Sequence, residues 1–221
     1  MPTTPDARAG RRPGPKPRLT RDEIVEAAVA VGVDRLSVAA VADRLGVAPG
    51  TLYRYVGGLD EIATAAVALV LARTPLSRVD GGWRAFLEAE AALSFDTLLR
   101  HAALVRDLDS DLGAVAADRM QRIIAVLRAA GFGLGAATRV ADAVLDIVAD
   151  GVHQTHWVND GHGELTGPAR TYLATLEEPL RGSVAAIMNA PRAHVLDKVA
   201  LVLDGVEHRR TGGHEGYADI E

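Results

Sequence analysis

Cysteine is absent from the 221-residue chain, and aromatic residues make up only 4% of it. Without cysteine the chain has no disulfide framework, no thiolate nucleophile, no iron–sulfur cluster and no cysteine zinc site. No apolar run is long enough to span a bilayer, and the basic, proline-rich residues 1–18 lack the apolar core of a secretory signal. We therefore expect no membrane span, and the absence of cysteine fits a cytoplasmic protein.

Positive charge is in the minority overall but is concentrated near the N-terminus. The net charge of −5 argues against a protein that coats nucleic acid along its whole surface. Residues 1–21 hold six basic residues and one acidic residue, a balance of +5 that leaves −10 for the remainder. A basic arm on an acidic body is typical of a protein that touches phosphates with one end. The alternative is a solvated tail.

Helical periodicity runs through the chain, and no stretch alternates in the manner of a β-strand. We therefore expect an all-α fold. The first helix is predicted to begin after Thr20, which forms a capping box with Glu23, and to end at Gly32. Ser37 is the expected cap of a second helix that stops at Gly46.

Glycine and proline delimit the remaining helices. A short third helix is expected from Pro49 to about Tyr55, because proline suits the first helical turn. Further helices are predicted over residues 59–73, 82–101, 115–130, 134–158, 168–189 and 192–209. Pro179 and Gly182 are expected to kink or divide the helix that they interrupt.

The second and third expected helices have the dimensions of a helix-turn-helix, with only two residues between Gly46 and Pro49. The N-terminal residues of the third helix would then enter the major groove of DNA, where hydroxyl and guanidinium groups suit base and phosphate contacts. Half-buried packing is the alternative for Tyr53 and Tyr55. The residues expected to contact DNA are Arg11, Arg12, Lys16, Arg18, Ser37, Val38, Ala48, Pro49, Gly50, Thr51, Tyr53, Arg54 and Tyr55.

The run of residues 36–56, followed by residues 59–62, resembles the TetR family of bacterial transcriptional regulators. The resemblance covers residues 19–70. It implies a three-helix DNA-binding domain and a larger helical domain that binds a small molecule and dimerises. Two positions depart from the family pattern: Ala48 stands where a serine or threonine often caps the recognition helix, and Leu59 where a lysine commonly lies near a phosphate. The basic arm is expected to supply the replacement charge.

The C-terminal body is similar to the tetracycline-repressor-like subgroup at residues 82–84, 98–101, 149–151 and 201–207. This resemblance implies that the helices over residues 134–158 and 192–208 pair with their twofold mates in a four-helix dimer interface. Packing inside one chain is the alternative for their apolar stripes, and both uses are compatible. A monomer would read only a half-site. The residues expected at the dimer interface are Val140, Val144, Ile147, Val148, Val195, Val199, Val202, Leu203 and Val206.

Small-molecule binding is a further implication of the resemblance. Leu108 stands where the tetracycline repressor has a histidine that binds the drug's magnesium, so we expect no magnesium–tetracycline site. A mostly apolar cavity with a few polar groups is expected instead, although a core position is the alternative for each candidate. The candidates are Trp83, Phe86, Phe95, Arg106, Met120, His153 and Trp157.

Enzymatic and metal chemistry find little support in the sequence. His153 and His156 are spaced to share a metal on a helix, but no third ligand is evident. The glycines of residues 131–135 follow a helix rather than a strand, which indicates a helix cap and not a nucleotide-binding turn. No nucleophile elbow or phosphate loop is present. We expect no enzyme activity, cofactor or metal.

The sequence thus predicts a homodimeric repressor that a small-molecule effector releases from a palindromic operator in double-stranded DNA. The alternative is a DNA-binding regulator that a partner protein controls or that needs no ligand, for which the C-terminal core would be filled. The expected division is a disordered basic arm (1–18), a helix-turn-helix domain (19–65), an effector-binding and dimerisation domain (66–210) and a flexible tail (211–221).

Deleting residues 1–17 is expected to flatten the salt dependence of DNA binding, because a protein that neutralises fewer phosphates releases fewer counterions. DNA-binding titrations of the full chain and the shortened chain over a series of salt concentrations measure this slope. An unaltered slope would mean that the arm does not contact phosphates.

Overall fold

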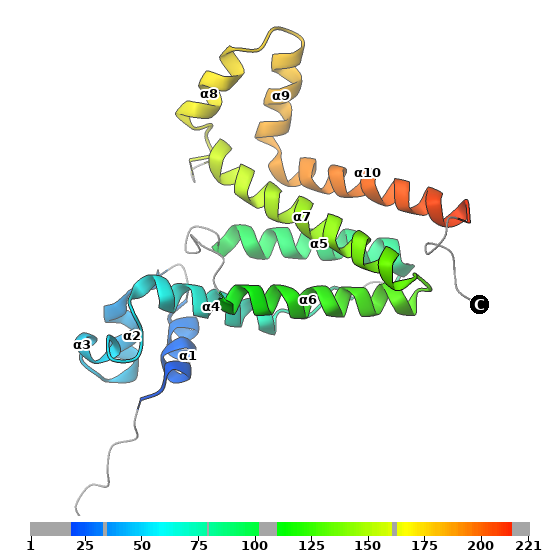
Figure 1. Ribbon diagram of the computed structural model, residues 1–221. Coiled ribbons are helices and arrows are strands. Elements are labelled where there is room, and N and C mark those ends of the chain that lie inside the picture. Colours follow the sequence, from blue (N-terminus) through cyan, green and yellow to red (C-terminus); the bar gives the residue numbers. More distant parts are fainter. Residues whose placement is uncertain (1–18, 33–34, 79, 102–109, 161–162, 214–221) are drawn as a thin grey trace, which may run out of the picture.

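A computed structural model describes residues 19–32, 35–78, 80–101, 110–160 and 163–213 (Figure 1). These residues form ten helices, and their only β-type pairing is an isolated antiparallel bridge between Asn159 and Leu165. The expectation of an all-α fold is confirmed. Within the described part of the chain, no helix has the length and apolar character needed to cross a bilayer.

One end of the elongated molecule consists of α1 (Arg21–Val31), α2 (Val38–Leu45), α3 (Pro49–Leu52) and the first part of α4 (Leu59–Arg73) (Figure 1). Side-chain caps fix where two of these helices begin. Thr20 and Glu23 form the predicted capping box on α1, and the Ser37 hydroxyl accepts a hydrogen bond from the Ala40 N–H at 3.1 Å. Gly46 ends α2 with a φ of 65°, a conformation that glycine adopts at little cost.

The third helix is shorter than the sequence predicted. It ends at Leu52 instead of Tyr55, and the residues between them form turns. The N–H groups of Arg54 and Tyr55 bond to carbonyls three residues earlier, those of Thr51 and Leu52, so the chain tightens before the glycine pair that follows. Helix α3 is therefore little more than one helical turn.

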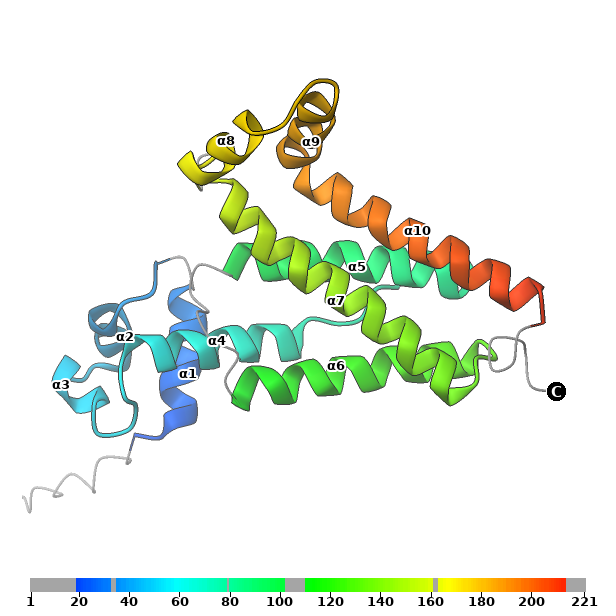
Figure 2. The ribbon, with the colours of Figure 1, turned by 45° about the horizontal axis from the view of Figure 1, so that its top comes forward.

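The body of the molecule packs α5 (Gly82–His101), α6 (Ser110–Ala129), α7 (Leu134–Val158) and α10 (Pro191–Thr211) around one apolar core. Figures 1 and 2 show α7 crossing α5 and α6, with α10 alongside α5 and α7. Helix α10 packs tightly against α7 at Gly151, where an added methyl group would lie 2.2 Å from Val195 Cγ2. Only glycine permits this spacing.

Two predicted helix boundaries differ from the observed ones. Helix α6 begins at Ser110 and runs through Gly113, whereas the sequence predicted a start at Val115; glycine inside a helix costs only about 1 kcal/mol. The helix predicted over residues 168–189 is divided into α8 (Gly167–Ala174) and α9 (Leu180–Asn189), with Pro179 at the start of α9. Division was one of the two expected outcomes. The pair α8 and α9 projects from the body as a hairpin (Figure 1).

Candidate functional site

The helix-turn-helix is built on side chains that lock α3 against α2. Val41 and Leu52 are fully buried in one cluster with Val56. Because Leu52 anchors α3 from beneath, the other side of the turn faces solvent, and Tyr53 is 58% exposed. Tyr55 instead packs partly buried against the same cluster. The packing alternative raised for both tyrosines therefore describes Tyr55 and not Tyr53.

The other predicted DNA contacts divide by exposure. Ala48, Pro49, Gly50 and Arg54 are exposed, whereas Ser37, Val38 and Thr51 are partly buried. The Ser37 oxygen already accepts the α2 capping bond. The structure also exposes Arg44 in the last turn of α2, which sequence reasoning missed although a basic residue at a helix C-terminus was a visible signal. The arm residues Arg11, Arg12, Lys16 and Arg18 lie outside the described residues.

Glu61 fixes the loop that follows α3. Its Oε2 accepts a hydrogen bond from the Gly57 N–H at 2.6 Å, and its Oε1 lies 3.1 Å from Arg21 Nε on α1. At the other end of α4, Arg73 pairs with Glu26 of α1, and this hydrogen-bonded guanidinium lowers the pKa of Glu26. Both contacts attach α4 to α1, so the helix-turn-helix end of the molecule and α4 form one connected unit.

A buried ion pair holds the segment between α4 and α5. Arg119 Nη2 on α6 lies 2.6 Å from Glu90 Oε1 on α5, and the Glu90 side chain is almost wholly buried. The second Glu90 oxygen accepts the Ser77 N–H at 3.0 Å, and Arg119 Nη1 donates to the Thr74 carbonyl at 3.2 Å. We call Glu90 and Arg119 the linker clamp, because their remaining bonds fix the backbone at both ends of residues 74–77.

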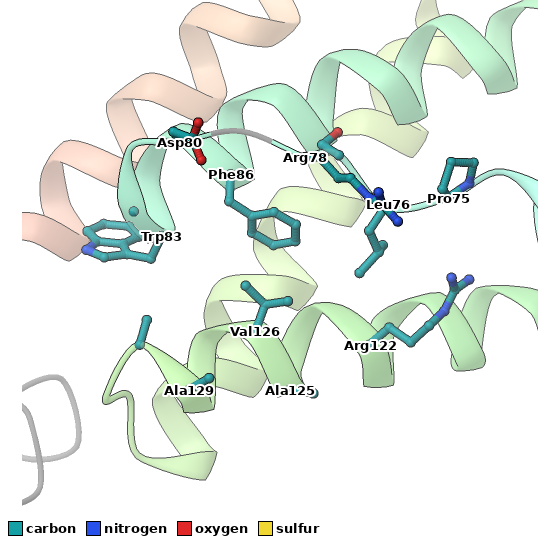
Figure 3. Close-up of a pocket in the computed structure, with 13 residues that line it drawn as sticks. Pro75, Leu76, Arg78, Asp80, Trp83, Phe86, Arg122, Ala125, Val126 and Ala129 are labelled. Carbon is teal, nitrogen blue, oxygen red and sulfur yellow. The ribbon is translucent and has the colours of Figure 1, made fainter.

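A cavity of about 960 Å³ lies beside the clamped segment (Figure 3). One wall is the segment itself and the start of α5, and the other is the second half of α6. Trp83 and Phe86 supply aromatic surface, and Arg78 and Arg122 supply positive charge from opposite walls. The lining residues are Pro75, Leu76, Ser77, Arg78, Asp80, Gly82, Trp83, Phe86, Arg122, Ala125, Val126, Ala129 and Ala130.

The Trp83 ring is held from behind by the turn between α6 and α7. It meets the fully buried Phe132 ring edge-on, with centroids 5.1 Å apart. The Arg210 guanidinium of α10 lies 4.7 Å from the Phe132 centroid and donates to the Ala130 carbonyl at 2.9 Å. The aromatic end of the cavity is therefore preorganised.

The predicted effector-binding residues do not all meet at this cavity. Trp83 and Phe86 line it, whereas Phe95 is fully buried in the core and Met120 is half-buried on α6. His153 and Trp157 are exposed near the far end of α7, and Arg106 lies outside the described residues. Sequence reasoning missed Arg78 and Arg122, because pockets walled by a linker leave no helical periodicity to follow.

Most of the predicted dimer residues are inside the chain. Val140, Val144, Val148, Val195, Val199, Leu203 and Val206 are buried where α7, α10 and α5 pack together. They form the intrachain core that was the stated alternative, because the most apolar stripe of each helix faces its own chain. Ile147 and Val202 keep partial exposure. The most exposed large apolar side chain of α10 is Leu201, at 70%.

The two histidines of α7 were considered from the sequence as a possible metal-binding pair. His153 and His156 are both exposed. Across the described ranges, no group of three or more histidine, aspartate and glutamate side chains is arranged to hold a metal ion.

Comparison with protein families matches both parts of the chain. Residues 21–66 match the family of bacterial regulatory proteins named tetR, and residues 74–209 match the tetracyclin repressor-like C-terminal domain. The chain belongs to the TetR family of bacterial transcriptional regulators. It is a DNA-binding regulator and not an enzyme.

Two curated relatives are also transcriptional regulators. The chain is 40% identical over 132 residues to the HTH-type transcriptional repressor DrrR1 of Streptomyces coeruleorubidus, which covers 55% of this chain and 49% of the relative. It is 34% identical over 145 residues to an HTH-type transcriptional regulator of Saccharopolyspora erythraea, covering 61% of each. The matches span about half to three fifths of these TetR-family relatives.

Solved structures share the fold at lower identity. A possible TetR family transcriptional regulator from Streptomyces coelicolor A3(2) has a TM-score of 0.57 and 22% identity over 86% of this chain and 100% of that one. A TetR variant from Acinetobacter baumannii AYE, solved in complex with minocycline, has a TM-score of 0.51 and 20% identity over 86% and 98%.

Breaking the linker clamp is expected to destabilise the fold. Glu90→Leu or Arg119→Met alone should lower the free energy of unfolding by roughly 3–5 kcal/mol, because each leaves a buried charge without its partner. The double variant should lose much less than the sum of the two. Urea denaturation measures these values, with Asp96→Asn, which breaks the exposed Asp96–Arg192 ion pair, as a control expected to cost under ~1 kcal/mol. Additive losses would contradict the pairing.

Proposed function

We propose that this TetR-family regulator is a homodimeric cytoplasmic repressor that binds a palindromic operator and is released by a small molecule. The observation that carries the proposal is that the chain segment lining the cavity, which begins at Pro75, follows directly after α4. A molecule in the cavity would therefore contact the chain that leads to the DNA-reading end. An open pocket of about 960 Å³ that presents aromatic and basic side chains beside this segment supports an effector site there.

The DNA-binding part of the proposal rests on the exposed side of α3. Pro49, Gly50 and Tyr53 project from a turn that Leu52 anchors, and Thr51 lies at its edge. A single turn presented in this way fits the major groove, with the N-terminal residues nearest the bases. The tyrosine hydroxyl and the Arg54 guanidinium are suited to phosphates. The repressor name of the Streptomyces relative is consistent with this role.

The dimer part of the proposal uses the outer faces of α7 and α10, since their inner faces are buried. Leu201 lies on such a face, flanked by the partly buried Val202, and Ile147 is partly exposed on α7. Two copies joined through these helices would present two α3 turns to successive major grooves, roughly 34 Å apart along the DNA. Twofold symmetry in the protein then matches a palindromic operator.

Control by an effector needs a difference in affinity between two states. A 100-fold loss of operator affinity corresponds to about 2.7 kcal/mol of coupling. In this proposal, α4 connects the DNA-binding end to the C-terminal body. Ile62 and Ala66 pack in the helix-turn-helix cluster, whereas Val67 and Ala68 pack with Val115 of α6. A shift of the segment after α4 would therefore move the two α3 turns. The minocycline complex of the Acinetobacter relative supports control by a small molecule.

Removing the hydroxyl groups of Thr51 and Tyr53 at the α3 turn is expected to weaken operator binding. Thr51→Ala and Tyr53→Phe should each cost at least ~1 kcal/mol, about fivefold in affinity, because each removes a hydroxyl aimed at DNA. Fluorescence anisotropy against duplex DNA from immediately upstream of the coding region measures the effect. Tyr172→Phe, which removes the hydroxyl of an exposed tyrosine on α8, is the matched control.

Circular dichroism and mass measurements on the same samples separate a lost contact from misfolding. Unchanged affinity for both variants, on a duplex that the parent protein binds in the presence of competitor DNA, would refute the assignment of α3. Absence of competitor-resistant binding by the parent would mean that the operator does not lie in that upstream DNA.

A charge on the outer face of α10 is expected to dissociate the dimer. Leu201→Glu should place a carboxylate in the apolar contact and shift the mass toward the monomer at micromolar concentration, with a parallel loss of operator affinity. Leu180→Glu is the control, since Leu180 is 55% exposed at the start of α9, outside the two helices proposed for the interface. Sedimentation equilibrium measures the mass, and an intact Leu201→Glu dimer would place the interface elsewhere.

A further inference from the structure

The cavity beside the clamped segment is electrically uneven along its length. Figure 3 shows the Arg78 and Arg122 side chains at the end marked by Pro75, and Trp83 with Asp80 at the other. Two guanidinium groups therefore face one part of the cavity, whereas aromatic and small apolar surface makes up the rest. Asp80 supplies the negative charge of the lining, so positive charge predominates by one.

Arg122 holds a donor that the protein does not use. Its Nη2 is buried and has no hydrogen-bond partner in the described part of the chain, although its Nε lies 2.9 Å from Asp118 Oδ2. Leaving a buried donor unpaired is unfavourable, and the cost is larger for a charged group. An acceptor supplied by a bound molecule would remove this cost. Arg119, one helical turn earlier, also has a buried Nε without a hydrogen-bond partner among the described residues, but its Nη2 lies 2.6 Å from Glu90 Oε1 and its Nη1 donates to the Thr74 carbonyl.

The opposite end of the cavity fits a flat ring. Ala125 and Ala129 are four residues apart on α6 and therefore lie on one face of that helix. Figure 3 shows Val126 of α6 facing Phe86, with Ala129 nearer the Trp83 end, so small and medium apolar side chains form this wall. Because Phe132 and Arg210 hold the Trp83 ring, little side-chain entropy is lost when a second ring contacts it.

We propose that this cavity binds a planar aromatic anion, whose carboxylate or phenolate accepts hydrogen bonds from Arg122 and whose ring lies between Phe86, Trp83 and the alanines of α6. The proposal rests on the effector role given above and names the chemical class of the effector. Arg78, on the opposite wall, adds a second cation near the anionic group. A planar guanidinium favours such groups because it donates two parallel hydrogen bonds to a carboxylate.

A pair of probes that differ only in charge tests the proposal. Naphthalene-2-carboxylate and naphthalene-2-carboxamide are titrated into the full-length protein by isothermal calorimetry. We expect the carboxylate to bind about tenfold more tightly than the amide, as charge-assisted hydrogen bonds are roughly twice as strong as neutral ones. Arg122→Met should weaken carboxylate binding about tenfold and leave amide binding nearly unchanged. In a Trp157→Phe background Trp83 is the remaining tryptophan, so a change in its fluorescence on adding the carboxylate reports binding beside it.

Arg100→Met is the matched control. It removes the same charge from the exposed end of α5 that lies away from Trp83, so it should not alter the preference for the carboxylate. Equal affinity for the two probes, equal carboxylate affinity in Arg122→Met, or no binding of either probe at millimolar concentration would each overturn the proposed ligand class.

Operator affinity measured in the same preparations, without any probe, tests the regulator proposal separately. Charge-dependent probe binding in a protein that binds no operator would uphold the ligand class and refute the repressor. A protein that binds the operator but binds neither probe, and whose operator affinity neither probe changes, would uphold the DNA-binding proposal and refute the ligand class.

Discussion

The buried pairing of Glu90 with Arg119 is the constraint on which the rest of the structure depends. Removing two charges from water is costly, and such a pair is tolerated only where its remaining hydrogen-bonding groups are satisfied. Here the linker backbone satisfies two of those groups: the Ser77 N–H donates to Glu90 Oε2, and the Thr74 carbonyl accepts from Arg119 Nη1. The ion pair therefore determines the path of the chain between α4 and α5. That path forms the wall of the cavity and sets where α4 ends.

The other end of α4 is bound to the DNA-reading helices just as directly. Arg21 pairs with Glu61 and Arg73 pairs with Glu26, so α1 is attached near both ends of α4. Exposed ion pairs of this kind contribute little stability. The buried face of α4 is rich in alanine and valine, and it carries most of the packing energy. Small side chains permit sliding with little repacking, which suits a helix that transmits a shift.

Local chemistry explains what the sequence predicted well. The Thr20 and Ser37 caps and the Gly46 stop depend on residues close together in the chain, and the structure has all three. The full extent of α7 follows from its periodicity in the same way. The end of α3 was wrong because a single turn has too few residues for periodicity to decide between a helix and consecutive turns. Long-range contacts were not predictable: nothing in the neighbourhood of Glu90 indicates that Arg119 lies beside it.

The dimer prediction shows a different limit. An apolar stripe records that a surface is buried, but it does not record whether the covering surface belongs to the same chain. The valines of α7 and α10 are covered by their own chain, and Gly151 allows the two helices to meet there. The outward faces of α7 and α10 are more polar, apart from side chains such as Leu201. An interface that forms after folding is expected to be built from such residues, because the most apolar ones have already been used.

The same distinction bears on the cavity. Trp83 and Phe86 were among the candidates for a mostly apolar effector cavity, whereas Arg122 was not, since one arginine on a helix is unremarkable in sequence. The structure separates two arginines of α6 that lie one turn apart: Arg119 pairs with the buried Glu90, whereas Arg122 pairs with the exposed Asp118 and lines the cavity. An anion bound to Arg122 would also attract Arg119 and so compete with Glu90 for its charge. A ligand at that position would weaken the bonds that hold residues 74–77. The ligand can reduce operator affinity only by as much as its own affinity differs between the state with these bonds formed and the state with them broken.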